Sequence, residues 1–271
     1  MAVDRTSVAD GLQRVDVFGL RFVDAPDEAH VTRQLLGSLG SDDGAETSLP
    51  VVVTPNVHHL VSLDRQPPGA EHELCRRARF VLPDGQPVVL AGRLLGRGIT
   101  ARLAGSTLFG HLWPELCREA IPTLLISPSE LVAERLLADH PTAWAYTPPF
   151  FDADDDAVLD HLVDICLPLA QDGAAEVVVV GLGNPKQERL VARLLDRWPE
   201  TGTPRPLFLC LGASLEFEAG LRRRAPRWMQ RVGLEWFFRF AQEPRRLFRR
   251  YFVEDVRFVG IVWREWRRLA T

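Results

Sequence analysis

The stretch EVVVVGLGNPKQE, residues 176–188, decides the fold of this chain. Its four consecutive valines predict a strand that is buried on both faces, and two glycines then allow a tight turn. Asn184 can cap a helix that follows, with Pro185 in its first turn and Gln187 placed to close a capping box. A buried strand that runs directly into a capped helix is typical of a parallel α/β sheet.

Three other runs repeat this pattern of a buried strand followed by a turn or a helix start. They are VVVT, LLIS and LFLCLG, at residues 51–54, 124–127 and 207–212. After the second run, Ser127 and Glu130 match a capping box, with Pro128 at the first helical position. Four such runs between helices predict an α/β fold with a mainly parallel sheet and flanking helices.

The turn after the valine strand also predicts an anion site. Gly181 and Gly183 let the chain turn, and the free N–H groups of the helix start would face the ligand, with Lys186 beside them. The motif is neither a Walker loop, which needs Gly-Lys-Ser/Thr, nor a dinucleotide fingerprint, because Lys186 stands where the third glycine would be. The alternative interpretation is a capped helix start without a ligand.

Two further strand ends carry polar residues. Asp84, followed by Gly85, is either a helix N-cap or a general base at a strand end. Thr54 and Asn56 offer short polar side chains that either bind a sugar or form a turn and a cap. Because ligands bind at the carboxyl ends of parallel strands, we expect these residues to share one site with the 181–188 loop.

The last 51 residues differ from the rest in charge. Residues 221–271 hold fourteen arginines against five acidic residues, a net charge of +9, so the remaining 220 residues carry −13 of the total of −4. This split predicts attraction to phosphate or anionic lipid at one end of the molecule. It argues against a nucleic-acid-binding protein, since the larger part is acidic and no nucleic-acid motif is present.

Two segments of this tail predict basic amphipathic helices. The first begins at Pro244, and its apolar side holds Leu247, Phe248, Tyr251 and Phe252. The apolar side of the second segment holds Phe258, Val259, Val262, Trp263, Trp266 and Leu269. Such helices suit a membrane interface, and they equally suit a helical layer docked on the body with solvated arginines. The two interpretations are compatible.

Other features bound the class of protein. No run approaches the roughly 18 apolar residues that span a bilayer, and the first ten residues do not resemble a signal peptide. Four scattered cysteines, without zinc-ligand spacing, predict a chain that folds in a reducing cytosol without metal or disulfides. Asp154-Asp155-Asp156 fits the D-x-D pattern of metal-dependent glycosyltransferases. It precedes a predicted helix rather than following a strand, so we interpret it as N-terminal helix charge.

Six blocks in order along the chain resemble the TagA/WecG/CpsF family of glycosyltransferases. They are TPNVHHLV, ARFVLPDGQPVVLAGRLLG, RLAGSTLF, VVVGLGNPKQE, LGASLEFEAG and RRAPRWMQRVGLEWFFRFAQEPRRLFRRY. The resemblance runs from about Val51 to Tyr251. Members of the family transfer N-acetylated aminosugars, or their acids, from UDP-sugars to lipid-linked acceptors in the synthesis of bacterial envelope polysaccharides.

The resemblance implies a role for each matching residue. Asp84 takes the place of the family's proposed catalytic base, Thr54 that of its polar partner, and Asn56 lies beside them. Gln187 matches a glutamine near the nucleotide sugar. In the family a C-terminal appendage closes over the pocket, supplies arginines and promotes membrane association, for which Arg224, Arg227 and Arg231 are the matching candidates.

The resemblance also implies a Rossmann-like core and an inverting reaction that needs neither metal nor cofactor. We expect a catalytic domain over 1–220 and a helical appendage over 221–271 that closes the site, contacts membrane, or does both. The full set of candidate catalytic and substrate-binding residues is Thr54, Asn56, Asp84, Gly85, Gly181, Gly183, Asn184, Lys186, Gln187, Glu188, Arg224, Arg227 and Arg231.

The expected partners are a UDP-sugar, a lipid-linked sugar acceptor and an anionic membrane, with the protein at the cytoplasmic face of the cell membrane. The sequence does not decide whether the protein forms a homo-oligomer. The alternatives are the same chemistry on a soluble acceptor from secondary metabolism, and a nucleotide-sugar-binding protein without transferase activity.

Overall fold

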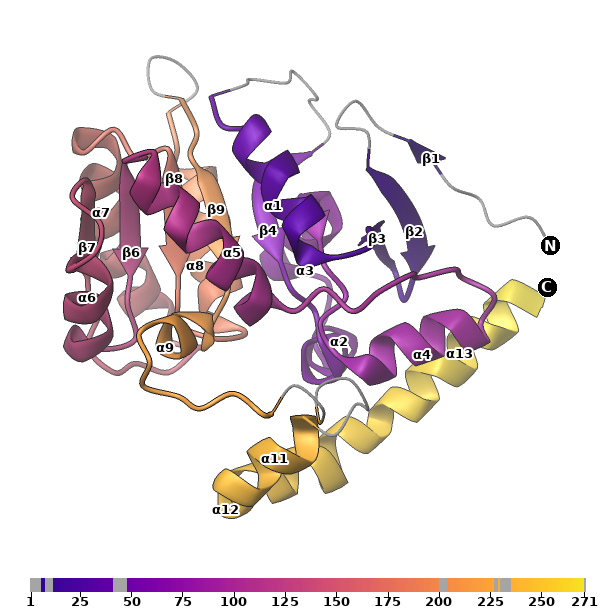
Figure 1. Ribbon diagram of the computed structural model, residues 1–271. Coiled ribbons are helices and arrows are strands. Elements are labelled where there is room, and N and C mark those ends of the chain that lie inside the picture. Colours follow the sequence, from indigo (N-terminus) through magenta and orange to yellow (C-terminus); the bar gives the residue numbers. More distant parts are fainter. Residues whose placement is uncertain are drawn as a thin grey trace.

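A nine-stranded sheet runs through the centre of the molecule (Figure 1). The computed structural model describes residues 6–7, 12–40, 48–199, 204–226, 229 and 235–270. The strands are β1 (Thr6–Ser7), β2 (Gln13–Val17), β3 (Leu20–Asp24), β4 (Leu49–Val53), β5 (Ala78–Val81), β6 (Thr123–Ile126), β7 (Ala143–Tyr146), β8 (Val177–Val180) and β9 (Leu207–Cys210). Their order across the sheet is β1-β2-β3-β5-β4-β9-β8-β6-β7.

Most of this sheet is parallel, which confirms the predicted fold class. All neighbours from β3 to β7 pair in parallel, and β1, β2 and β3 pair antiparallel at one edge. The four runs expected as strands are β4, β6, β8 and β9, and β4, β9 and β8 are adjacent. Since parallel strands end at the same edge, the loops after these strands meet in space.

Helices cover both faces of the sheet and make a three-layer fold. Those before the C-terminal segment are α1 (Glu28–Gly37), α2 (Val57–Arg65), α3 (Ala70–Arg77), α4 (Gln86–Leu94), α5 (Gly105–Arg118), α6 (Glu130–Leu137), α7 (Asp156–Asp172), α8 (Lys186–Asp196) and α9 (Ser214–Glu218). In β8, Val178 and Val180 pack in the core with α2, α3, α4, α7 and α8, whereas Val177 and Val179 pack with α1, α5, α6 and α9. Because successive side chains of β8 point to opposite faces and both faces are buried, every position of the strand is apolar, and its sequence is an unbroken run of valines.

Two of the expected capping boxes do not form. Ser129, not Ser127, caps α6 by accepting a hydrogen bond from the N–H of Val132, and Ser127 Oγ instead donates to the Ser129 carbonyl. Helix α8 begins at Lys186 and has no side-chain cap. The amide of Gln187 is therefore free for contacts outside its own helix, which become important in the cavity described below.

The C-terminal segment lies beyond the carboxyl ends of the strands (Figure 1). It consists of α11 (Glu235–Gln242), α12 (Pro244–Arg249), a π-helical turn (Arg250–Glu254), a 3₁₀ turn (Asp255–Arg257) and α13 (Phe258–Ala270). Helix α13 contacts α2. Phe258 and Ile261 belong to the buried core, so α13 is packed on the body of the molecule by one side.

The predicted division of this segment into an apolar and a basic side is wrong for Arg250, which lines a cavity together with Leu247 and Tyr251, and the predicted apolar side is buried only in part. Leu247 is buried, but Phe248 and Phe252 are exposed, and Arg250 points inward instead. In α13 the outward side holds Val259, Trp263 and Trp266, which are 70%, 54% and 56% exposed. The reason is that α12 covers a polar cavity rather than an apolar core, and the π-helical turn shifts the phase of the residues that follow it.

Candidate active site

A polar cavity of about 400 Å³ lies at the carboxyl ends of four adjacent strands, β5, β4, β9 and β8. Residues that follow each of these strands line the cavity: Asp84 after β5, Thr54 and Asn56 after β4, Ser214 after β9, and Gly183 after β8. The three strand ends that the sequence singled out therefore contribute to one cavity. The loop after β9 is a fourth contributor.

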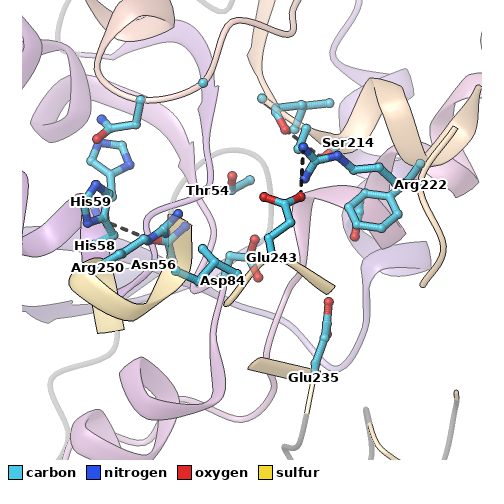
Figure 2. Close-up of a pocket in the computed structure, with 18 of the residues that line it drawn as sticks. Thr54, Asn56, His58, His59, Asp84, Ser214, Arg222, Glu235, Glu243 and Arg250 are labelled. Atoms are coloured by element: carbon cyan, nitrogen blue, oxygen red, sulfur yellow. Dashed lines mark hydrogen bonds and ion pairs between the residues drawn. The ribbon is translucent and has the colours of Figure 1, made fainter. Parts of the chain in front are cut away.

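Backbone hydrogen bonds hold the loops after β4 and β5 together. The N–H of Leu82 donates to the Val53 carbonyl over 2.8 Å, and the N–H of Asp84 donates to the Pro55 carbonyl over 3.1 Å. Helix α4 begins at Gln86 with Gly85 as its N-cap, so Asp84 does not cap that helix. The N-cap interpretation of Asp84 is therefore wrong, and its side chain lies at the cavity, as Figure 2 shows.

Asn56 and Thr54 are each placed by a close neighbour. Asn56 caps α2, since its Oδ1 accepts from the N–H of His59 over 3.1 Å. A Cβ atom at Gly105 would lie 3.1 Å from Thr54 Cγ2 and 3.4 Å from Ser214 Oγ. Glycine at position 105 thus lets α5 start against both side chains and brings the loops after β4 and β9 together.

The two glycines after β8 serve different purposes. Gly183 has a φ of +75°, a left-handed conformation that favours glycine. A Cβ at Gly181 would lie 2.9 Å from side-chain atoms of Leu215 and of Pro128, so this glycine is required for close packing. The loop after β9 also packs closely against the loop after β8, because a Cβ at Gly212 would lie 3.4 Å from the Cα of Gly183.

Arginines reach the cavity from the segment after α9 and from the C-terminal helices. Arg222, Arg223 and Arg250 line the cavity, and Figure 2 shows Arg222 and Arg250. Arg222 pairs with Glu216 at 2.9 Å and with Glu243 at 3.6 Å. Arg250 lies 3.5 Å from Asn56 Oδ1 and therefore connects the C-terminal segment to the loop after β4.

A further arginine, Arg102, lies behind Asp84. Burial lowers its pKa, but the neighbouring carboxylates of Asp84 and Glu235 raise it more, so the net shift is upward. Arg102 also forms an ion pair of 2.7 Å with Glu235 on α11. Arg102 was not among the residues predicted from the sequence, because it lies in the loop between α4 and α5 rather than directly after a strand. It is the first residue of the block RLAGSTLF.

Several candidate residues lie elsewhere. Lys186 is outside the cavity lining: its ammonium group donates to the Phe151 carbonyl and lies 4.5 Å from the centre of the Phe150 ring. Arg224 is also outside it and donates to the Ser106 carbonyl. Arg227 and Arg231 lie outside the described residues. The expected arginine contribution therefore comes, in the described chain, from Arg222, Arg223 and Arg250.

The acidic run 154–156 lies at the N-terminus of α7. Asp155 caps that helix by accepting from the N–H of Val158, and Asp154 pairs with Arg189. This confirms the interpretation of the run as helix-terminal charge. In the ranges that the structure covers, no helix has the length and apolar character needed to cross a bilayer.

These features define a class of protein: an α/β enzyme fold with a cavity at the strand ends, a carboxylate at its wall, and arginines together with a glycine-rich loop suited to an anionic ligand. The sequence model of the Glycosyl transferase WecG/TagA/CpsF family matches residues 15–271. The chain therefore belongs to this family and is a glycosyltransferase of that type. The match extends the resemblance to the β2–β3 hairpin and to α13.

Proposed function

We propose that the protein transfers an N-acetylated aminosugar, or its uronic acid, from a UDP-sugar to a lipid-diphosphate-linked acceptor in cell-envelope polysaccharide synthesis. The observation that carries this proposal is the placement of Asp84. It lies at the cavity beside Thr54 and Asn56, is not needed as a helix cap, and faces a wall that includes Arg222 and Arg250. A candidate base, polar side chains suited to a sugar, and arginines thus line one cavity, which supports the proposal.

The proposed reaction is a single displacement with inversion. Asp84 accepts the proton of the acceptor hydroxyl while that oxygen forms a bond to the anomeric carbon. The bond from this carbon to the diphosphate oxygen breaks, and UDP leaves with the electron pair. The positive charge of Arg102 lies close to Asp84 and is part of the electrostatic surroundings of its carboxylate.

Charge on the departing diphosphate has two proposed sources of stabilisation. One is the N-terminus of α8, where backbone N–H groups follow the Gly183 turn. The other is the set of arginines at the cavity, whose fixed charges need no metal ion as an intermediary. We therefore propose transfer that is independent of metal.

The acceptor is proposed to reach the site from the inner face of the cell membrane, where the exposed aromatic and basic side of the C-terminal segment would lie against anionic lipid. A soluble acceptor is the second candidate. It rests on the cavity itself, which is polar and open to solvent and has no built feature specific for a lipid chain among the described residues.

The decisive experiment offers a panel of UDP-sugars, together with a lipid-diphosphate-sugar acceptor and a soluble sugar acceptor, and identifies products by mass spectrometry. We expect one N-acetylated donor to give a product with the lipid-linked acceptor. Product only with the soluble acceptor would favour the second candidate. UDP-sugar binding without any product would instead indicate a binding protein and overturn the proposal.

A further inference from the structure

A buried network of amides and a carboxylate lies between the cavity and the core. Its centre is Glu188, a fully buried carboxylate on α8. Its Oε1 accepts from the Gln187 side-chain amide over 2.8 Å, and its Oε2 accepts from the Asn184 side-chain amide over 3.1 Å. Both amides belong to residues that line the cavity, whereas Glu188 does not line it.

This network fixes which end of each amide is available. An ionised carboxylate can only accept hydrogen bonds, so both amides must turn their NH₂ groups toward Glu188. The Oε1 of Gln187 then accepts from the backbone N–H of Gly212 over 2.9 Å, which ties the loop after β8 to the loop after β9. Both ends of the Gln187 amide are therefore used within the protein.

Asn184 differs from Gln187 at its oxygen. Its Oδ1 is shielded from water and accepts no hydrogen bond from any described residue. A shielded acceptor without a donor is unfavourable, and because Asn184 lines the cavity, a ligand that displaces the groups shielding this oxygen would supply the missing donor. The adjacent Glu188 prevents the amide from rotating to present its NH₂ group instead.

We propose that Glu188 is a positioning residue that fixes the orientation of the Asn184 amide, and that the unpartnered Asn184 oxygen accepts a hydrogen bond from the nucleotide sugar once the bound ligand displaces the groups that shield it. This inference rests on the proposed function for the identity of the ligand. The donor is either the uracil N–H or a hydroxyl or acetamido N–H of the sugar. Glu188 thereby determines specificity without touching the substrate.

A paired substitution tests the lock. Asn184→Asp alone places two carboxylates in contact, and Glu188→Gln alone introduces an amide that can accept from one neighbour but turns an NH₂ group toward the other. In the double variant the new amide at 188 donates to the new carboxylate at 184 and accepts from Gln187. One oxygen of the new carboxylate is then left without a donor among the described residues, as the Asn184 oxygen is in the wild type.

The first readout is the midpoint of thermal unfolding without ligand. Each single change should lower it by about 2–4 °C or more, the scale of one lost buried hydrogen bond in a chain of this size, and the double variant should recover most of that loss. A double variant no more stable than the weaker single variant would overturn the role of Glu188.

The second readout is the dissociation constant of UDP and of UDP-N-acetylglucosamine, used as probes in titration calorimetry. Glu188→Gln should weaken binding about tenfold, and the double variant should restore it. Electrostatics alone predicts the opposite sign, because removing a negative charge near a diphosphate should strengthen binding. Unchanged or tighter binding by Glu188→Gln would therefore sink the proposal.

The two probes locate the donor group. Weakening with both probes assigns the hydrogen bond to the nucleotide, and weakening with UDP-N-acetylglucosamine alone assigns it to the sugar. If the wild-type protein binds neither probe, the proposed function fails and the ligand role of Asn184 with it, whereas the unfolding comparison still decides whether Glu188 holds the amides.

Glu71→Gln is the matched control. Glu71 is also a buried carboxylate, and it acts on the pKa of the same His59 ring as Glu188 does. It pairs with Arg189 at 3.1 Å, and it is not part of the cavity lining. The control should lower stability but leave both dissociation constants within about twofold of the wild type.

Discussion

Asp84 is the residue on which the proposed chemistry depends most directly. Asp84→Asn keeps the size and polarity of the side chain but removes its ability to accept a proton. We expect UDP-sugar binding to stay within a few fold and the turnover number to fall by roughly 10² or more, the usual scale for loss of a general base. Steady-state kinetics with saturating substrates, together with calorimetric binding, make the measurement. An unimpaired turnover number would rule Asp84 out as the base.

Cys75, His59 and Glu188 are arranged like a catalytic triad, but the thiol is not activated as a nucleophile. Cys75 Sγ lies 3.6 Å from His59 Nε2, and His59 Nδ1 lies 3.9 Å from Glu188. Burial raises the pKa of the Cys75 thiol well above its usual value and lowers the pKa of His59 despite the nearby carboxylates. The thiol of Cys75 therefore stays protonated and buried in the core, although His59 itself lines the cavity.

The acid stability of the protein should depend on His140. This side chain is 2% exposed, packs against Trp113 with the ring centres 4.9 Å apart and the rings tilted, and has no hydrogen-bond partner for either ring nitrogen among the described residues. Burial lowers its pKa. Since the unfolded chain then binds a proton more readily, the stability due to neutral His140 is complete above about pH 6.5 and is lost as pH falls toward the folded pKa.

His140→Phe keeps the stacked ring and removes the titratable group. Chemical unfolding at several pH values should show the variant losing less stability than the wild type between about pH 6.5 and 5, by up to about 1.4 kcal/mol per pH unit. His59, with its own lowered pKa, remains in both proteins. Parallel stability curves for the two proteins would show that His140 does not contribute.

At the scale of elements, the sequence predicted the strands with the strongest local signal. β4, β6, β8 and β9 are apolar runs buried on both faces, and that burial leaves a mark on the sequence without any knowledge of the fold. β7 has only intermediate burial at the sheet edge, and β5 follows α3 directly with no turn signal between them. These strands are defined by pairing with distant neighbours, which a local pattern does not contain.

The site was predictable where it follows a strand and unpredictable where it depends on the tail. Thr54, Asn56 and Asp84 were found because parallel strands end together. Arg222 and Arg250 were not singled out, because fourteen arginines in the tail look alike until packing decides which ones face the cavity. Lys186 shows the opposite error: its place beside the glycines suggested a ligand, but two aromatic rings hold it elsewhere.

The start of α8 and the arginines lead to a prediction about metal removal. Because fixed positive charges lie at the cavity and Asp154–Asp156 serve α7, transfer should survive EDTA with less than about a twofold loss. The assay compares UDP release in the presence of EDTA with release after adding Mg²⁺ or Mn²⁺. Loss of activity with EDTA and its recovery with either ion would contradict a metal-independent mechanism.

Across the whole molecule, the C-terminal segment has three different surroundings at once. Phe258 and Ile261 pack in the core, Leu247 and Arg250 line the cavity, and a third side is open. Removing the segment would therefore disturb folding, the site and the open side together. Point substitutions on the open side separate its role from the other two.

That open side carries most of the exposed large apolar residues of the described chain. Nine of the fourteen belong to the exposed surface of the C-terminal segment: Trp236, Phe237, Phe248, Phe252, Val253, Val256, Val259, Trp263 and Trp266. Within α13, Val259, Trp263 and Trp266 are spaced by four and three residues, which keeps them on one side of that helix. Exposed arginines flank them, and such a combination favours binding to an anionic bilayer surface.

We expect Trp263→Ser combined with Trp266→Ser to weaken binding to phosphatidylglycerol vesicles by at least about tenfold, because both rings contribute apolar burial while the arginines, worth about 1 kcal/mol each near the surface, remain. Neither tryptophan lines the cavity, so UDP release with a water-soluble acceptor should be unchanged. Leu131→Ser is the control: Leu131 is 48% exposed on α6 and should affect neither measurement. Vesicle co-sedimentation at low and high salt makes the comparison, since the arginine contribution should weaken with salt and the aromatic contribution should not. If the double variant sediments as the wild type does, the open side is not a membrane surface, and the acceptor must reach the cavity without it.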